Sequence, residues 1–162
     1  LCSGSGAIAV ALDKISGAEV TAVEIDETAF SYLETNVKEN NSSVKPVMAD
    51  ALKICETFAD GELDLIVSNP PYIKSADIET LQKEVQLEPR LALDGGEDGC
   101  DFYREIVSRW SRKLKKGGAL AFELGENQAD AVKALMTDKG FSDFKISLDF
   151  GGVQRAIIGT LL

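Results

Sequence analysis

The stretch LDLIVSNPPY, residues 63–72, decides the fold, because an apolar run in it ends abruptly on two prolines. A short continuous run of leucine, isoleucine and valine is typical of a buried strand in a parallel sheet. Each proline fixes φ, removes a backbone N–H and pushes the residue before it into extended geometry. The stretch therefore predicts a strand over 63–67 and a stiff turn at its carboxyl end, where open α/β sheets bind their ligands.

The turn from Asn69 to Tyr72 carries groups that suit a flat ligand with an NH2 group. Carbonyl oxygens meet few competing backbone donors there, since Pro70 and Pro71 have no N–H. Asn69 adds one side-chain acceptor and two donors, and Tyr72 adds a ring and a hydroxyl. An amide, or the amino edge of a nucleobase, would fit such a turn. Because Asn-Pro and Pro-Pro are also ordinary turn signals, a purely structural turn is the alternative.

Outward from this turn, apolar periodicity and glycine or asparagine stops predict helices that alternate with strands. We expect a strand end and glycine turn at 1–6, strands at 19–23, 44–48, 63–67, 119–124, 144–148 and 156–161, helices at 7–15, 27–40, 102–115 and 127–139, and a short amphipathic piece at 51–58. The long irregular segment 73–101 is typical of a lid or binding loop. Only 149–155 separates the last two strands, so these should be antiparallel neighbours. The predicted fold is α/β and Rossmann-like, a mostly parallel seven-stranded sheet with one antiparallel strand and helices on both faces.

The composition describes an acidic chain of one domain's size, with 162 residues and a formal charge of −10. No apolar run approaches the roughly 20 residues that a membrane-spanning helix needs. Phosphate backbones are bound largely through lysine and arginine, so this charge argues against a domain that grips nucleic acid by itself. The chain has no histidine, which excludes a His-based triad or a Cys/His zinc site. Three scattered cysteines suit reduced thiols and a cytoplasmic location.

Three consecutive strand ends carry residues that suit an adenosine ligand. Gly4 and Gly6 lie at a strand-to-helix turn, where a ligand can approach the backbone and a helix amino terminus closely. Glu24 ends the next strand, where a carboxylate can accept hydrogen bonds from ribose hydroxyls. Asp50 ends the third strand and is placed to accept from an adenine amino group, while Ile25 can pack on the ring. The third glycine of a dinucleotide fingerprint is absent, so a ligand without a pyrophosphate is favoured. For each acid alone, a solvated strand end is the alternative.

Taken together, these stretches resemble the class I S-adenosylmethionine-dependent methyltransferases, and more narrowly the HemK/PrmC protein-(glutamine-N5) methyltransferases, which are release factor glutamine methyltransferases. The resemblance covers essentially the whole chain and is carried by LCSGSGAIA at 1–9, NPPYI at 69–73, EPRLALDGG at 88–96 with Asp98-Gly99, Gly117-Gly118, ELG at 123–125 with Gln128, and 149–155 followed by Gly159. Asn-Pro-Pro-Tyr is shared with enzymes that methylate amino groups of adenine or guanine. The segment 88–96 is far more particular to the glutamine enzymes. Glu24 departs from the family's usual aspartate.

The resemblance implies methyl transfer from S-adenosylmethionine to the side-chain amide nitrogen of a glutamine in the Gly-Gly-Gln motif of peptide-chain release factors, with S-adenosylhomocysteine as the product. It implies that Asn69, Pro70 and Tyr72 are catalytic and that these residues and Pro71 contact the substrate. Residues expected to contact the cofactor are Cys2, Gly4, Gly6, Glu24, Ile25, Asp50, Ala51 and Asn69. No metal and no membrane partner are expected, and the release factor is the expected protein partner of a monomeric catalytic domain over 1–162.

Other positions that match the family have less definite expectations. Glu88, Arg90 and the glycines at 95, 96 and 99 are expected to shape the long loop around the substrate, with Arg90 as an internal ion-pair partner. Glu123 and Gln128 also match positions of the family, but the sequence suggests no role for either residue. The family's amino-terminal helical domain has no counterpart in 1–162, and residues 1–6 resemble the last part of a first strand, so we expect amino-terminal sequence to be missing.

The main alternative function is an N-methyltransferase acting on the exocyclic amino group of adenine or guanine in DNA or RNA. Such an enzyme needs a base flipped out of its stack and a basic surface to hold the strand. A methyltransferase fold that serves only as an interaction subunit is a second alternative, against which the intact motifs argue. A nucleotide-dependent dehydrogenase is a third, disfavoured by the missing glycine.

Overall fold

The computed structural model describes all of residues 1–162, and the chain divides into two compact units, Leu1–Thr57 and Phe58–Leu162. The first unit contains a two-stranded sheet and the second a four-stranded sheet. None of the three cysteines forms a disulfide, as predicted. No helix has both the length and the apolar character that crossing a membrane requires.

The first unit follows the predicted alternation of helices and strands. Its elements are α1 (Ala7–Ser16), β1 (Thr21–Glu24), α2 (Glu27–Glu39), β2 (Lys45–Met48), α3 (Ala51–Ile54) and a 3-10 turn at Cys55–Thr57. β1 and β2 pair in parallel, with Val23 opposite Val47. A small apolar core joins both helices to the sheet and consists of Ala9, Ala22, Leu33 and Val44.

Residues 1–6 form a turn that leads into α1, and no strand is assigned to them. Ser3 donates its backbone N–H to the carbonyl of Val23 at 3.0 Å, so this segment runs beside β1. Gly6 precedes α1 with φ 84°, in the left-handed region. A Cβ at this position would overlap the side chain of Leu33. Both the backbone conformation and the packing of α2 therefore require glycine at position 6.

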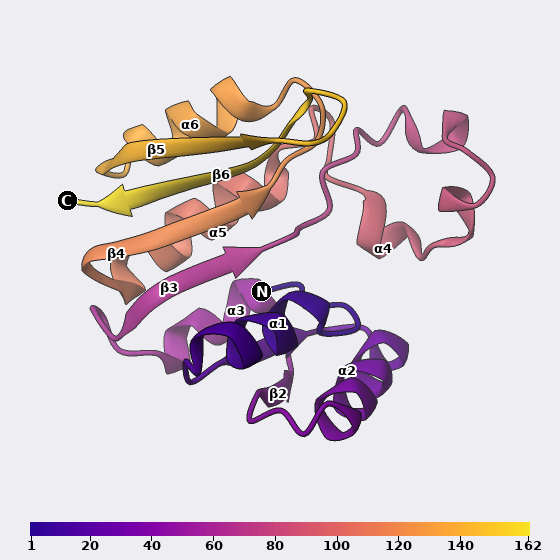
Figure 1. Cartoon of the computed structure of the whole chain (residues 1–162). Helices are drawn as coiled ribbons and strands as arrows, with labels where there is room; N and C mark the ends of the chain where they lie inside the picture. The colour runs from indigo at the N-terminus through magenta and orange to yellow at the C-terminus, as the bar shows by residue number, and fades with distance from the viewer. The chain divides into compact units, whose positions relative to one another are not determined.

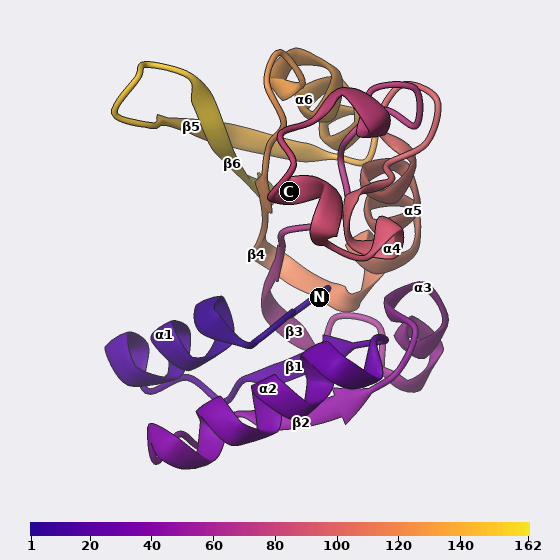
Figure 2. The ribbon, with the colours of Figure 1, turned by 90° about the vertical axis from the view of Figure 1, so that its right-hand side faces the viewer.

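The second unit has one sheet with strand order β3-β4-β6-β5. Its elements are β3 (Leu63–Ser68), α4 (Arg90–Leu93), α5 (Asp101–Trp110), β4 (Leu114–Glu123), α6 (Ala129–Thr137), β5 (Phe141–Leu148), β6 (Gln154–Leu161), and 3-10 turns at Ile78–Thr80, Val85–Leu87 and Ser111–Lys113. β3 and β4 are parallel, whereas β6 is antiparallel to both of its neighbours. Figures 1 and 2 show α5 and α6 on one face of this sheet. The core includes the fully buried Trp110, Tyr103, Phe122 and Met136.

The strand directions bring three chain segments to one end of the four-stranded sheet. β3, β4 and β5 all run the same way, so their carboxyl ends lie together. The irregular segment that contains α4 leaves from the end of β3, as Figure 1 shows. The turn between β5 and β6 lies at this same end. The predicted substrate turn after β3 therefore sits where the fold gathers its loops.

The predicted element order and the reversed last strand are confirmed, while the sheet arrangement and several element boundaries differ from the prediction. The structure has six strands in two sheets, so a single seven-stranded sheet is not confirmed. The strand predicted to begin at Ala119 begins at Leu114, because an irregularity between Leu63 and Leu65 shifts the β3–β4 register and accommodates Gly117 and Gly118 within the strand. The helix before it ends at Trp110, where a 3-10 turn replaces its expected last residues.

Candidate active site

The glycine turn of the first unit is organised around the carboxylate of Glu24. Its Oε2 accepts the backbone N–H of Gly4 at 2.7 Å, and its Oε1 accepts those of Ile25 and Asp26 at 2.8 and 2.9 Å. The side chain is buried, with 8% of its residue surface exposed. Three backbone donors thus converge on one carboxylate, which gives each of these N–H groups a partner. The structure brings together two of the predicted cofactor residues, Gly4 and Glu24.

Asp50 lies at the end of β2, next to the end of β1. The link between these ends is a hydrogen bond from the N–H of Ala49 to the carbonyl of Glu24 at 2.9 Å. Asp50 Oδ1 accepts the N–H of Leu52 at 2.9 Å and thereby caps α3, and Oδ2 pairs with Lys53 at 3.2 Å. The capping role was missed from the sequence, although aspartate before a helix is a common N-cap. Its predicted contact with adenine stays a prediction.

The turn and the two strand ends bring open backbone, an apolar side chain and a carboxylate to one edge of the first unit. A Cβ built on Gly4 meets no atom within 4 Å, so there is open space before this backbone. Ile25 is 49% exposed and offers an apolar surface beside Glu24. Glu24 uses three of its roughly four acceptor positions and retains capacity for a hydroxyl. The turn and both strand ends carry no lysine or arginine that could pair with a phosphate.

In the second unit, the Asn-Pro-Pro-Tyr turn follows β3 directly, as predicted. Pro70 and Pro71 are buried, Tyr72 is half-buried and Asn69 is exposed. The side-chain amide of Asn69 makes no hydrogen bond within the protein. The two prolines fix the backbone next to Asn69. The donors and the acceptor of the Asn69 side chain are therefore all available to a ligand.

Three glycines pack against Tyr72 of this turn, at distances that leave no room for a side chain. A Cβ on Gly95 would lie 2.7 Å from Tyr72 Cα, and one on Gly99 would lie 2.5 Å from the Tyr72 carbonyl oxygen. A Cβ on Gly125 would lie 2.9 Å from Cδ2 of the Tyr72 ring. The prediction that Gly95 and Gly99 shape the loop is consistent with this packing, and Gly125 has the same role.

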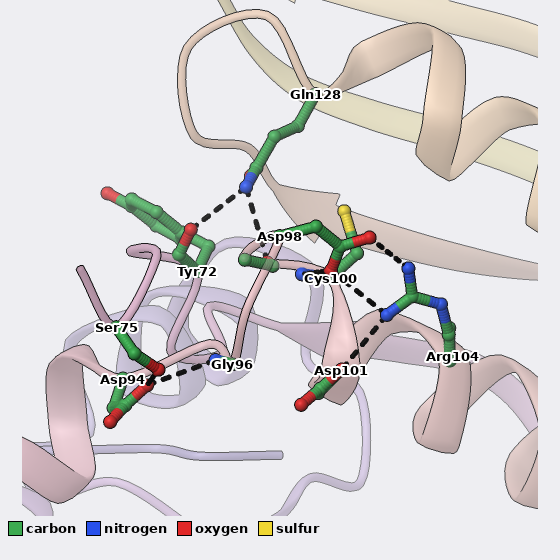
Figure 3. Close-up of polar contacts among 10 residues, drawn as sticks. Tyr72, Ser75, Asp94, Gly96, Asp98, Cys100, Asp101, Arg104 and Gln128 are labelled. Atoms are coloured by element: carbon green, nitrogen blue, oxygen red, sulfur yellow. Dashed lines mark hydrogen bonds and ion pairs between the residues drawn. The ribbon is translucent and has the colours of Figure 1, made fainter. Parts of the chain in front are cut away.

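Backbone pairing fixes the chain that leaves the turn. Ile73 donates its N–H to Leu93 at 2.9 Å and accepts the N–H of Gly95 at 2.7 Å. Asp94, between these partners, accepts the hydroxyl of Ser75 at 2.5 Å and the N–H of Gly96 at 3.1 Å, contacts visible in Figure 3. These two donors lower the pKa of Asp94 below its ordinary value.

Arg90 pairs with Asp94 at 2.9 Å, four residues further along the same loop. The guanidinium is therefore an internal partner, as its sequence position predicted. A second ion pair holds the other end of the loop, where Arg104 contacts both Asp98 and Asp101. The Arg104 guanidinium lowers the pKa of Asp98. The loop over 88–101 thus has charged contacts near both ends.

Tyr72 is oriented by Glu123, the last residue of β4. Its hydroxyl donates to Glu123 Oε1 at 3.2 Å. Burial of the ring, and then the nearby carboxylate charge, raise the pKa of Tyr72 above its usual value of about 10. The phenol therefore stays protonated at neutral pH and remains a donor to Glu123. This contact supplies the role for Glu123 that the sequence did not.

Gln128 is the functional candidate that sequence reasoning noted without explaining. Its Nε2 donates to the carbonyl of Tyr72 at 2.9 Å, as Figure 3 shows, and to that of Gly99 at 3.2 Å. It lies 56 residues beyond Tyr72 in the chain, so no local spacing rule links the two. The only signal was its place in the ELG-x-x-Gln stretch.

Comparison with known proteins gives a consistent result. A family model described as "Methyltransferase small domain" matches residues 1–97. The chain is 42% identical over 160 residues to the release factor glutamine methyltransferase of Geobacter sulfurreducens, which covers 98% of this chain and 55% of that protein. It is 34% identical over 161 residues to the release factor glutamine methyltransferase of Clostridium acetobutylicum, covering 98% and 56%. The chain therefore spans about half the length of the curated relatives that it matches.

Solved structures agree on the fold. A methyltransferase from Pyrococcus furiosus matches with a TM-score of 0.74 and 25% identity over 98% of this chain and 71% of that one. The precorrin-6y C5,15-methyltransferase from Geobacter metallireducens matches with a TM-score of 0.67 and 12% identity over 100% of this chain and 77% of that one, which concerns the fold alone. These matches confirm the predicted class I methyltransferase fold, and the curated relatives confirm the resemblance read from the motifs.

Proposed function

This chain belongs to the methyltransferase small domain family, and on that premise we propose that it transfers a methyl group from S-adenosylmethionine to the side-chain amide nitrogen of a glutamine. The observation that carries the proposal is the state of Asn69, an exposed amide without a partner in the protein, on a turn braced by buried prolines and packed glycines. The printed names of the curated relatives support glutamine as the target and a release factor as its carrier.

Asn69 and Pro70 would hold the amide that receives the methyl group. A carboxamide nitrogen is a poor nucleophile, because its lone pair is delocalised into the carbonyl. If the Asn69 Oδ1 and the Pro70 carbonyl accept its two N–H bonds, the nitrogen is held in one orientation and growing positive charge on it is stabilised. Tyr72 would form one wall, and Pro71 keeps the turn rigid. No histidine is needed, because the proton can leave after transfer.

The cofactor would be held by the glycine turn and the two strand ends of the first unit. When bound, S-adenosylmethionine supplies a methyl group that its sulfonium already activates. The open backbone at Gly4 suits close approach, and the remaining acceptor capacity of Glu24 suits ribose hydroxyls. Ile25 would contact the adenine ring, and Asp50 would accept from its amino group. Further contacts are expected from Cys2, Gly6 and Ala51.

The substrate we propose is the Gly-Gly-Gln segment of a peptide-chain release factor, methylated in the cytoplasm. A chain with a formal charge of −10 suits a basic protein segment better than a nucleic acid backbone. The chain is expected to act as a monomer. The charge also makes the base-modifying alternative less favourable, since phosphate contacts rely on lysine and arginine.

The test is methyl transfer from labelled S-adenosylmethionine by the complete polypeptide. The acceptors are a release factor, the same factor with its Gly-Gly-Gln glutamine replaced by alanine, duplex DNA, and RNA. We expect label on the unmodified release factor alone. Label on DNA or RNA would overturn the proposal in favour of a base methyltransferase, and label that persists on the alanine factor would place the methyl group elsewhere.

A further inference from the structure

The side chain of Gln128 has every hydrogen-bonding position engaged inside the second unit. Its Nε2 donates to the Tyr72 and Gly99 carbonyls, and its Oε1 accepts the N–H of Gly125 at 2.9 Å. The hydroxyl of Tyr103 lies 3.2 Å from the same Oε1 and 2.9 Å from the Glu123 carbonyl, so its single proton is shared between them. Gln128 is only 9% exposed. A primary amide has two N–H donors and one acceptor oxygen, which is what these neighbours require.

This side chain does not serve its own helix. Gln128 occupies the N-cap position of α6, yet its side chain makes no capping hydrogen bond there. Its partners instead belong to the turn after β3, the loop before α5 and the turn after β4. A residue whose purpose was to start the helix would bond to the first N–H groups of that helix. The side chain of Gln128 therefore joins three loops to one another rather than capping its own helix.

The Tyr72 carbonyl is the point at which a side chain from a distant part of the chain holds the substrate turn. The two preceding residues are prolines, which have no N–H to pair with neighbouring strands. Ile73 is already fixed on both its N–H and its carbonyl by residues 93–95. The bond from Gln128 fixes the Tyr72 carbonyl, so it sets the plane of the peptide that links Tyr72 to Ile73. It also keeps this carbonyl from competing for the hydrogens of a bound amide.

We propose that Gln128 is a positioning residue that holds the Tyr72 carbonyl, and through it fixes Asn69 and the Pro70 carbonyl in the geometry that receives a substrate amide. This inference rests on the proposed function for the identity of that amide. It assigns to Gln128 no contact with the substrate or the cofactor. The amide acts through Tyr72, while Gly99 and Gly125 hold the other sides of the same junction.

The test compares Gln128→Glu with the matched control Gln154→Glu, an exposed glutamine on β6, both in the complete polypeptide. The glutamate keeps the shape of Gln128 but turns two donors into acceptors that face carbonyl oxygens. Because a displacement of about 1 Å can cost ~100-fold in rate, we expect kcat on the release factor to fall by that order in Gln128→Glu. The dissociation constant of S-adenosylhomocysteine should stay unchanged in both variants.

Two further readouts separate positioning from general stability. Lowering the pH should raise the ratio of variant to native kcat, because a protonated carboxyl regains one O–H donor for the Tyr72 carbonyl. Gln128→Ala should show no such recovery. Hydrogen exchange of the amides at 72–75 should be faster in folded Gln128→Glu than in Gln154→Glu. If Gln128→Glu does not fold, Gln128→Asn replaces it, since asparagine keeps the amide but is one methylene shorter.

The proposal is overturned if folded Gln128→Glu keeps native exchange protection at 72–75, or if its kcat equals that of Gln154→Glu. Its failure differs from a failure of the proposed function. If the native enzyme methylates nucleic acid and leaves the release factor unlabelled, the glutamine assignment fails. The exchange and pH readouts on the accepted substrate then still decide the role of Gln128.

Discussion

The glycine turn of the first unit and the Asn-Pro-Pro-Tyr turn of the second both follow parallel strands, but they solve opposite hydrogen-bonding problems. At the glycine turn, backbone N–H groups converge, and the carboxylate of Glu24 accepts three of them. At the proline turn, Pro70 and Pro71 lack N–H groups and carbonyls remain, so the amide of Gln128 donates to the Tyr72 carbonyl and also to that of Gly99 in the loop before α5. A carboxylate therefore accepts the unpaired N–H groups of the first turn, and an amide donates to an unpaired carbonyl of the second.

This difference determines what each turn can offer a ligand. The first leaves an open backbone at Gly4 and a carboxylate with remaining acceptor capacity, which suits hydroxyls. The second leaves Asn69 exposed, which suits an NH2 group. In both, a buried polar side chain holds the backbone: Glu24, which also offers acceptor capacity to a ligand, and Gln128, which does not. Substitutions at each turn should therefore affect different measurements.

The largest effect is expected from Asn69→Ala, which removes the exposed acceptor of the second turn. Loss of one preorganised hydrogen-bonding group at a reacting centre costs ~100–1,000-fold in kcat. We expect a fall of that order in methyl transfer to the release factor. Asn40→Ala, at the exposed end of α2, is the matched control and should retain native turnover. A similar loss in both variants would contradict a specific role for Asn69.

Glu24→Gln should act on the first turn alone and affect cofactor binding. The amide has one oxygen where the carboxylate has two, so its NH2 would face a backbone N–H that keeps no partner. Hydrogen bonds to charged groups contribute ~1.5–3 kcal/mol, and a loss of this size corresponds to a roughly 10–100-fold larger dissociation constant for the cofactor. Calorimetric titration with S-adenosylhomocysteine measures it. Glu34→Gln, exposed on α2, is the control, and equal affinities in the two variants would separate Glu24 from the cofactor site.

Gly125→Ala should loosen the second turn without removing any of its polar groups. The new Cβ would lie 2.5 Å from Gln128 Oε1 and 2.9 Å from the Tyr72 ring. Overpacking of this kind costs about 1–3 kcal/mol in the free energy of unfolding. Denaturant titration should show this loss in Gly125→Ala but little change in Gly151→Ala, where the nearest atom would be 3.2 Å away. Unchanged stability in Gly125→Ala would mean that the junction around Tyr72 adapts easily.

Local sequence signals predicted the parts of both turns that neighbouring residues determine. Two prolines after an apolar run are enough to predict the stiff turn after β3, and glycines before an apolar helix predict the turn before α1. Glu24 and Asp50 could be placed because parallel strands bring their carboxyl ends to one edge. The capping role of Asp50 was also within reach, because it depends on a residue only two positions away.

The supporting contacts could not be predicted, because they join residues far apart in the chain. Gln128 meets Tyr72 across 56 positions, and Glu123 meets it across 51. Neither periodicity nor spacing reports such pairs. The early start of β4 at Leu114 was missed for a related reason: Gly117 and Gly118 look like a strand boundary, but the register shift opposite Leu63 and Leu65 keeps them inside the strand.

The smallest effect concerns pH at the loop that braces the second turn. Ser75 and Gly96 donate to Asp94 and lower its pKa in the folded chain, so the unfolded chain binds the proton more readily. The stability that this carboxylate contributes is therefore fully present above the ordinary aspartate pKa of about 3.9 and is lost as the pH falls through the lower folded value. Protection factors for the amides of Ser75 and Gly96 should fall over that range in the native chain. In Asp94→Asn they should be lower at neutral pH and should not show this step, since asparagine does not titrate. If the native chain keeps its protection throughout this range, backbone pairing at residues 73–95 holds the loop without the charge of Asp94. The second turn would then depend less on a carboxylate than the first turn depends on Glu24.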